Sequence, residues 1–329
     1  MRRTLGLVLA LCVLAAGAPA ATGSGGPSTT QVAVGEGSVW ATAGAGTIRI
    51  VPRGDPRVIA EGYADSLFAD GSVVAGGSAW TLGGGALTRI DLATGRIIGA
   101  PIRVGDPPAA LVAGGDRVYV IDQYGGGRIS QISTTTGRSA GRGFLPGSRL
   151  WTGRVAGGSL WVAQHGFQTP RERREGGYSG AGRILRLDRA TGTVAAAVEV
   201  GQVPIDTAAA WGALWVIDDS DHTLRRIDLA TSRVTATIHV PRGARAVTAA
   251  AGRLWVALPD GVVRIDPGRG RIVGRTRIPG GVIDLEAGLG SVWAGSACGG
   301  RVFRLAPGTG RIIDRIAVPT ARPSQCPGD

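Results

Sequence analysis

The sequence predicts an all-β protein, a seven-bladed β-propeller of four-stranded antiparallel blades. An aromatic residue inside a short apolar strand recurs at spacings of 40, 39, 42, 54, 40 and 38 residues. One four-stranded unit cannot bury both faces of its sheet, whereas radial packing of seven such units buries a continuous core between them. The recurring aromatic residues are Trp40, Trp80, Tyr119, Trp161, Trp215, Trp255 and Trp293.

A second strand and a turn follow each aromatic, as in LTRIDLATGRI from Leu87 and LRRIDLATSRV from Leu224. Their period-two alternation predicts a strand with Ile or Leu inward and Arg and Asp outward. The D-x-x-T-G segment predicts a hairpin, in which Gly supplies a positive φ. Helical periodicity is absent after the first twenty residues, so all elements are expected to be strands.

The recurring aromatic residues are expected to be wedges between blades, because large aromatics dominate such interfaces. Trp151 and Trp211 fall outside this register. We expect these two tryptophans on the surface.

The N-terminus carries the pattern of a secretion signal. Two arginines precede an apolar run from Leu5 to about Ala16, and Ala18 to Ala20 read A-x-A. A run of about twelve residues is too short to span a bilayer, so no stable membrane insertion is expected. The expected division is a removed signal at 1–20, a short flexible segment at 21–28, the propeller at 29–319 and a C-terminal tail at 320–329.

Charge and cysteine content bound the partners. The formal net charge is +12, which favours polyanionic partners. The chain has no Lys and no Asn, however, so arginine serves as its general surface cation, and a secreted protein seldom meets nucleic acid. We therefore expect no nucleic-acid partner. Loss of Cys12 with the signal leaves Cys298 and Cys326, which predict one disulfide rather than a zinc site, because no C-x-x-C pair is present.

The patterns P-x-x-x-A-x-G-x-G-S-[VL]-W-V and x-R-I-D-x-x-T-G-R-[IV] recur from about Thr29 to Pro319. In these motifs the chain resembles secreted bacterial seven-bladed propellers of the YVTN and virginiamycin-B-lyase-like type. The resemblance implies four strands per blade, A to D from the centre outward. It also implies one face holding the B–C loops and D–A connections, here named the loop face. The A–B and C–D turns form the opposite turn face.

Irregular sequence concentrates on the loop face, where we expect the ligand, because loops on a rigid scaffold carry binding groups. Blade four adds about fourteen residues between strands B and C, read either as a lid over a ligand or as a tolerated surface insertion. The candidate ligand-face residues are Asp122, Tyr124, Trp151, His165, Arg171, Arg173, Arg174, Tyr178, Asp206, Asp218, Asp219, Asp221, His222, Arg245, Asp284 and Glu286.

Acidic residues depart from the repeat in the innermost strands. Asp206 and Asp284 lie nine residues before the aromatic of their blades, and Glu286 lies seven before, so all three share a strand face. They either bind a cation or act as acid and base, or they cap backbone amides at the strand entrance. With Asp218 they form the candidate metal set for a divalent cation, Mg²⁺ or Ca²⁺. The DDSDH loop that begins at Asp218 reads as a cation contact or as a solvated turn.

The lyase of this resemblance uses a metal with His and Glu groups in motifs resembling P-H-x-I and W-F-T-E. The corresponding positions read Pro204-Ile205-Asp206 and Trp215-Val216-Ile217-Asp218, which supply carboxylates and no histidine. The chain also has no G-x-S-x-G elbow, no H-E-x-x-H and no P-loop. No catalytic residue is therefore singled out.

We accordingly predict a secreted, monomeric, non-catalytic ligand-binding or scaffold protein for a small molecule or a cell-envelope polymer. One alternative is a divalent-metal-dependent lyase or hydrolase that uses the candidate metal set with His222 or His165. The other is adhesion to anionic cell-envelope polymers through an arginine group. That group comprises Arg171, Arg173, Arg174, Arg242 and Arg245.

Overall fold

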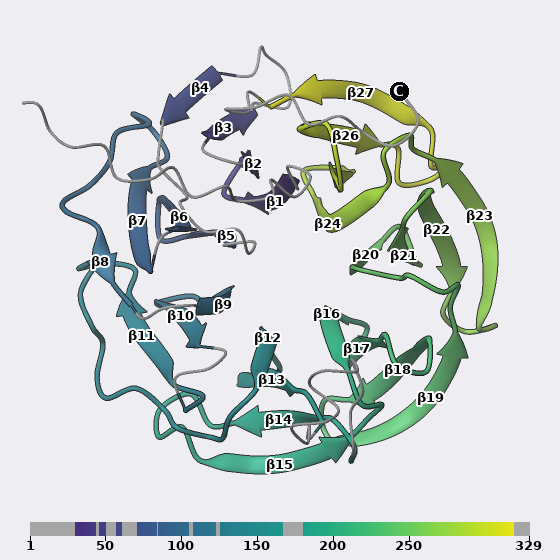
Figure 1. Ribbon diagram of the computed structural model, residues 1–329, viewed down its shortest axis with the longest axis horizontal. Coiled ribbons are helices and arrows are strands. Elements are labelled where there is room, and N and C mark those ends of the chain that lie inside the picture. Colours follow the sequence, from purple (N-terminus) through teal and green to yellow (C-terminus); the bar gives the residue numbers. More distant parts are fainter. Residues whose placement is uncertain are drawn as a thin grey trace, which may run out of the picture.

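The computed structural model is a ring of seven antiparallel sheets (Figure 1), which confirms the predicted fold class. The structure describes residues 30–43, 46–50, 57–60, 71–83, 85–104, 108–122, 126–166 and 180–318. All regular elements in these ranges are strands. Among these residues there is no helix that is long and apolar enough to cross a membrane. The expected signal, the short N-terminal segment and the C-terminal tail lie outside the described residues.

Each blade is built from consecutive strands in order from the centre outward. Blade one has β1 (Thr30–Gly35), β2 (Ser38–Ala43), β3 (Gly46–Ile50) and β4 (Arg57–Ala60); blade two has β5 (Ser72–Ala75), β6 (Ser78–Gly83), β7 (Ala86–Asp91) and β8 (Ile102–Arg103); blade three has β9 (Pro108–Ala113), β10 (Arg117–Asp122) and β11 (Ile129–Ser133). Blade four has β12 (Leu150–Ala156), β13 (Ser159–Gln164), β14 (Arg183–Leu187) and β15 (Val194–Glu199); blade five has β16 (Pro204–Ala210), β17 (Ala213–Asp218), β18 (Thr223–Asp228) and β19 (Arg233–His239). Blade six has β20 (Val247–Ala250), β21 (Arg253–Leu258), β22 (Gly261–Asp266) and β23 (Arg271–Arg277); blade seven has β24 (Val282–Gly288), β25 (Ser291–Ser296), β26 (Arg301–Leu305) and β27 (Ile312–Ala317).

Blade three differs in its outermost position. Its sheet has three regular strands, and the segment 139–144 fills the place of the fourth through two isolated bridges, Ile132 to Ser139 and Ile129 to Phe144. The predicted four-stranded blade is therefore completed here by irregular chain.

The recurring aromatic residues are wedges between blades, as predicted. All seven are at most 2% exposed. Trp215 of blade five packs in one cluster with Leu254 and Val256 of blade six. Trp293 of blade seven packs in the same way with Val32 of blade one, so a single type of contact both links the blades and closes the ring.

The repeat arginine is half-buried rather than turned to solvent. The guanidinium of Arg186 lies 5.5 Å from the ring centre of Trp161, its cross-strand partner. Its Nε donates to the Ser159 hydroxyl at 3.0 Å, and its Nη1 donates to the Ser232 hydroxyl of the next blade at 3.2 Å. The Trp and Arg of the repeat, with the Ser of G-S-x-W, are thus one stacked unit that touches two blades. The same stack joins Arg89 to Trp80, Arg264 to Trp255 and Arg304 to Trp293.

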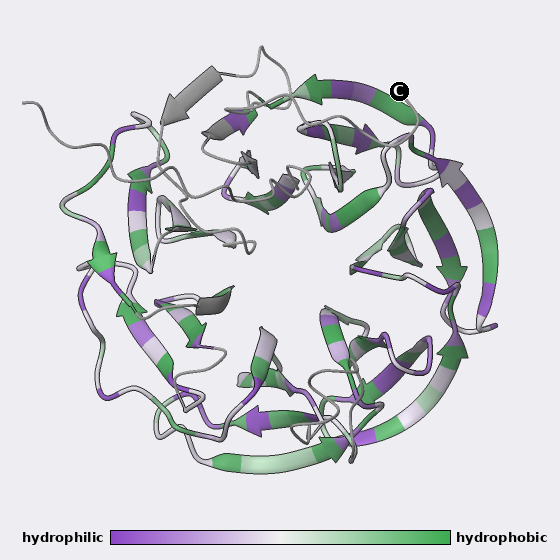
Figure 2. Cartoon of the chain, in the orientation of Figure 1, coloured by the Kyte–Doolittle hydropathy of each residue, from purple (hydrophilic) through white to green (hydrophobic). Residues whose placement is uncertain are grey.

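The Asp of R-I-D holds the turn that follows it. Asp228 Oδ1 accepts hydrogen bonds from the Thr231 amide at 2.8 Å and the Thr231 hydroxyl at 2.9 Å. These bonds lower the pKa of Asp228, because they stabilise the carboxylate. Figure 2 shows hydrophilic and hydrophobic bands alternating along the third strands of the blades, such as β7 and β22, as the period-two pattern predicts.

Ring closure occurs where β24 and β25 meet β1. Asp284 Oδ2 accepts a hydrogen bond from the Val32 amide at 2.7 Å, and the Thr30 and Ser296 hydroxyls lie 3.4 Å apart. A Cβ on Gly295 would lie 2.0 Å from the Thr30 carbonyl oxygen. Blades one and seven each keep their own four strands, so close backbone packing, and no exchange of strands, closes the described ring.

Gly295→Ala should therefore open this contact. We expect the free energy of unfolding to fall by about 1–3 kcal/mol, the usual cost of overpacking a tight site. Urea denaturation followed by tryptophan fluorescence measures the change. The matched control is Gly308→Ala in the same blade, where an added Cβ meets no atom within 4 Å; equal stability of the two variants would contradict the close approach at Gly295.

Candidate functional site

The ring encloses a channel that is crossed by an ion pair between Arg154 and Glu286. Arg154 on β12 and Glu286 on β24 come from blades four and seven, on opposite sides of the ring (Figure 1). Arg154 Nη2 lies 3.4 Å from Glu286 Oε1, and its Nε donates to the Thr207 carbonyl at 2.7 Å. Both side chains line a channel cavity of about 240 Å³. The channel is therefore polar and is bridged at this level.

Asp206 and Asp284 lie beside this pair and join neighbouring blades. Asp206 Oδ2 accepts a hydrogen bond from the Val247 amide of blade six at 2.7 Å, which matches the bond between Asp284 and Val32. The sequence left two interpretations of these acids open, a cation or acid–base site and a cap of backbone amides. Both carboxylates have the geometry of an amide cap, and each cap joins two blades instead of lying within one strand.

Burial raises the pKa of Asp206 to about 6 and that of Asp284 to about 7. The amide bonds oppose this shift in both groups, while the neighbouring Glu286 charge adds to it. The channel therefore holds two carboxyl groups that change charge near neutral pH.

Asp218, the fourth member of the candidate metal set, lies in a different environment. It is 1% exposed, and its oxygens accept hydrogen bonds at 3.0 Å from the Ser220 amide of the turn after β17 and from the Val203 amide of the connection into β16. Its charged neighbours are Asp221 and Arg225 rather than the channel acids. The structure thus brings together three of the four acids. Within the described ranges, no group of three or more His, Cys, Asp and Glu side chains has the arrangement needed to hold a metal ion.

The DDSDH loop is tied to its own blade. Asp221 forms an ion pair with Arg225 and accepts the Thr223 hydroxyl bond at 2.6 Å. Burial would raise the pKa of Asp221, but these partners outweigh it and lower the pKa. His222 has a φ of 55°, and its carbonyl accepts the Val240 amide at 2.9 Å. Asp219 is half-buried in the same turn and donates its amide to Val203. These contacts match the turn reading of the loop.

An aromatic pair stands at the base of the blade-four insertion. Trp151 stacks on His165 with ring centres 4.9 Å apart and planes inclined by 26°. Trp151 is 36% exposed and His165 only 8%. A register shift in β12 between Leu150 and Gly153 interrupts the strand at Trp151. Burial lowers the pKa of His165 to about 4, so its imidazole is neutral near pH 7.

The other candidates are dispersed. Asp122 ends β10 and is buried, which raises its pKa to about 6. Arg242 and Arg245 are exposed in the connection from β19 to β20 on the loop face. Trp211 is exposed as predicted, but it lies in the turn between β16 and β17 on the turn face. Outside the described residues lie Tyr124, Arg171, Arg173, Arg174, Tyr178 and Cys326. The disulfide of Cys298 with Cys326 therefore stays a prediction.

Sequence reasoning missed a larger hollow. A cavity of about 640 Å³ lies at the outer rim between blades three and four, beside the turn that joins β14 to β15. The sequence feature that could have indicated this cavity is the departure of blade three from the repeat, where Tyr119 replaces Trp and Gln131 replaces Arg.

Comparison with known proteins places the fold in a broad setting. No protein-family model and no curated protein matches the chain. Solved structures do match. Virginiamycin B lyase from Staphylococcus aureus has a TM-score of 0.65 at 16% identity, over 83% of this chain and 92% of that one. The likeness shows the fold alone.

Two further solved structures illustrate its breadth. The Pan2 WD40 domain of Neurospora crassa has a TM-score of 0.63 at 13% identity, over 84% of this chain and 87% of that one. BamB from Moraxella catarrhalis has a TM-score of 0.55 at 17% identity, over 81% and 79%. A lyase, a WD40 domain and BamB thus share this architecture, so function has to be argued from particular residues.

The raised pKa of Asp284 predicts a pH-dependent stability. Its folded pKa of about 7 exceeds the ordinary value of 3.8, so its contribution is fully present below pH 4 and is lost as the pH rises through 7. Asp284→Asn keeps an oxygen for the Val32 amide but cannot ionise. Between pH 4 and pH 8 we expect the wild-type free energy of unfolding to fall more than that of the variant, by about 2–4 kcal/mol.

Urea denaturation across this pH range measures the difference. The control is Asp314→Asn on the outer strand β27, where the carboxylate is half exposed. If wild type and Asp284→Asn show parallel pH profiles, Asp284 is not the titrating group.

Proposed function

We propose that the protein is a non-catalytic binding protein whose ligand contacts the loop face at Trp151. The observation that carries this proposal is the stack of a half-exposed indole on a buried, neutral imidazole. A large aromatic residue in a globular protein is ordinarily buried, and this one is displayed by a strand irregularity.

The residues packed behind Trp151 favour a rigid binding surface. His165 donates its amide to the Arg149 carbonyl at 3.1 Å, and Gln164 donates its side-chain amide to the Ser148 carbonyl at 2.9 Å. These bonds tie the end of β13 to the segment that leads into β12. An indole held from behind loses little conformational entropy when a ligand stacks on its open face.

The chemistry of this surface fits a ring-bearing ligand such as a saccharide. The exposed indole offers a flat apolar face, and the neutral His165 adds no charge behind it. Arg242 and Arg245 add positive charge on the same face of the ring. A cell-envelope polymer that combines sugar rings with anionic groups would meet both features.

The contacts of the acidic residues favour binding over catalysis. Asp206 and Asp284 hold neighbouring blades together, and Asp218 holds the turn after β17 through Ser220. Each of these carboxylates thus has a structural task that accounts for its departure from the repeat.

Trp151→Ala should weaken binding to purified envelope polysaccharide. We expect an affinity loss of roughly 3- to 10-fold, as for the loss of one aromatic stacking contact. Co-sedimentation with peptidoglycan and with an anionic wall polymer measures it at two salt concentrations. Trp211→Ala is the matched control, because that tryptophan is exposed on the turn face. Equal binding by wild type and Trp151→Ala to both polymers would overturn the proposal. Salt-sensitive binding to the anionic polymer alone would assign the arginines the larger part.

Export is part of the same proposal and has its own test. Expression of the full chain in a secreting bacterial host should yield a mature protein that begins near residue 21. Intact mass under non-reducing conditions should show Cys298 and Cys326 joined. A mature protein that retains residues 1–20, or that carries two free thiols, would contradict export and the disulfide respectively.

A further inference from the structure

Blade three departs from the repeat at neighbouring positions. Tyr119 stands at the position of the repeat tryptophan, and Gln131, its cross-strand partner, stands at the position of the stacked arginine. The outer strand is also irregular. Two bridges enclose three steps on β11 but five on the segment 139–144, so the outer chain bulges between them.

In other blades the stacked arginine occupies the space between its own tryptophan and the next blade. Arg89 reaches the Thr135 carbonyl of blade three at 3.2 Å, and Arg264 reaches the Gly308 carbonyl of blade seven at 3.0 Å. Gln131 is shorter than arginine, and its side chain bonds to Arg117 and Arg142 of blade three.

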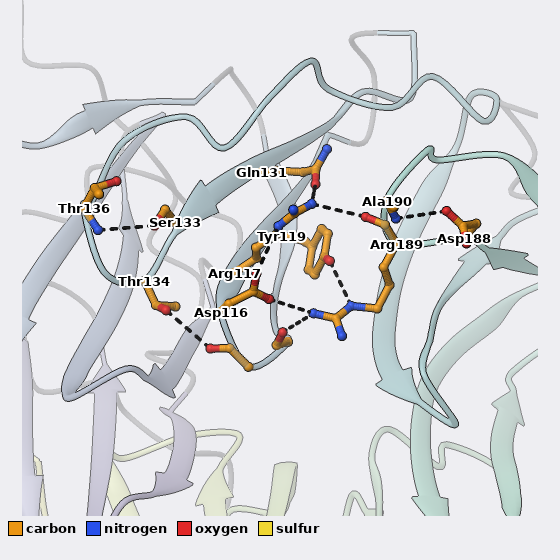
Figure 3. A network of polar contacts seen from close by, with 12 residues as sticks. Asp116, Arg117, Tyr119, Gln131, Ser133, Thr134, Thr136, Asp188, Arg189 and Ala190 are labelled. Atoms are coloured by element: carbon orange, nitrogen blue, oxygen red, sulfur yellow. Dashed lines mark hydrogen bonds and ion pairs between the residues drawn. The ribbon is translucent and has the colours of Figure 1, made fainter.

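Two other arginines restore the link between blades three and four (Figure 3). Arg189 donates from Nε to the Tyr119 hydroxyl at 3.0 Å and pairs through Nη2 with Asp116 at 3.1 Å. Arg117 donates from Nη1 to Gln131 Oε1 at 2.5 Å and to the Arg189 carbonyl at 3.2 Å. The blades are therefore joined without a guanidinium at residue 131.

The bulge of the outer chain borders a cavity. Gln131 donates from Nε2 to the Arg142 carbonyl at 3.0 Å and so ties the bulge to β11. Below it, the ring of Phe144 lies against the blade-four turn, where a Cβ on Gly192 would come within 2.0 Å of it. The cavity of about 640 Å³ lies among these groups, a volume within the usual range of small-molecule sites.

The lining of this cavity has two chemically different parts. Arg117 and Arg142 supply positive charge, and no carboxylate is found among the described residues that line it. Arg117 Nη1 and Gln131 Nε2 already bond within the protein, so Arg142 is the main candidate to contact an anion. Leu145 and Val194 supply apolar surface and are 68% and 40% exposed. A ligand with an anionic head and a short apolar body would satisfy both parts.

We propose that this rim cavity binds a small amphiphilic anion, a carboxylate or phosphate joined to an apolar chain. The site is independent of the loop face. Tyr119 and Gln131 depart from the repeat, and the bonds of Arg117 and Arg189 compensate for them. The fold is therefore kept although blade three borders a cavity. Such compensated breaks of a local rule are typical of functional sites.

Isothermal titration calorimetry with octanoate and with octyl phosphate tests the proposal and distinguishes the two head groups. Octylamine and octyl glucoside have the same chain without the negative charge. We expect saturable binding of at least one anion and no comparable binding of the amine or the glucoside. Equal binding of all four, or of none, would overturn the proposal.

Variants locate the site. Arg142→Gln should weaken anion binding roughly 5- to 10-fold, the usual scale for loss of a charge-assisted contact. Leu145→Ser should weaken it by a similar factor through lost apolar contact. The matched control is Arg138→Gln, an exposed arginine that directly precedes the segment 139–144 and does not line the cavity. An equal loss in Arg138→Gln would indicate nonspecific attraction and refute the site.

Trp151→Ala separates this site from the loop face. We expect its octyl-anion affinity to equal that of wild type, whether or not it still binds polysaccharide. A parallel loss of both activities in this variant would show that the two sites are not independent.

Discussion

The contact between one blade's aromatic residue and the next blade is the constraint on which the molecule depends. Each of these side chains buries about 150–250 Å², which corresponds to roughly 4–6 kcal/mol of apolar burial. The repeat arginine covers the ring, the repeat serine orients the arginine, and the guanidinium reaches the next turn. In blades two, four and seven the Trp, Arg and Ser of the repeat thus form one interface. Blades five and six have Ala213 and Arg253 in place of the serine, and the contact that recurs around the whole ring is that of the aromatic residue.

This constraint limits where function can arise. Strand positions are fixed by the interface, so variation is tolerated in loops and wherever another residue can replace a missing part of the stack. The loop face offers the first opportunity, and there a strand irregularity leaves Trp151 exposed against His165. Blade three offers the second, because Arg117 and Arg189 take over the work of the arginine that Gln131 replaced.

The fold followed from the sequence because its determinant is periodic. Spacing of the aromatics gave the blade number, and alternation gave the strands. Alternation alone did not predict that the repeat arginine packs against the tryptophan and the next blade instead of facing solvent. Alternation only separates the two faces of a sheet, and in a propeller both faces of a blade are covered by neighbouring blades. Strand parity grouped Asp206, Asp284 and Glu286 correctly, but it carried no information on Arg154 across the ring.

The rim cavity lay beyond pattern reasoning for a related reason. Tyr119 and Arg189 are 70 residues apart and belong to different blades, so their pairing has no local signal. Asp218 shows the opposite limit. It matched the channel acids in residue type, yet its place at the end of β17 directs it toward the amides of the following turn and of the connection into β16. The residue type showed that these side chains carry negative charge, but only the position of each residue in the ring showed which groups it contacts.

Closure of the ring by packing and by one carboxylate has an evolutionary and practical consequence. Every blade is an uninterrupted stretch of chain, and the junction of blades seven and one uses the same kind of contact as the others. The junction that closes the ring is therefore of the same kind as those between consecutive blades. We expect a circularly permuted gene that starts at another connection between blades to encode the same ring, and duplication of single blades is a direct route by which such a chain can grow.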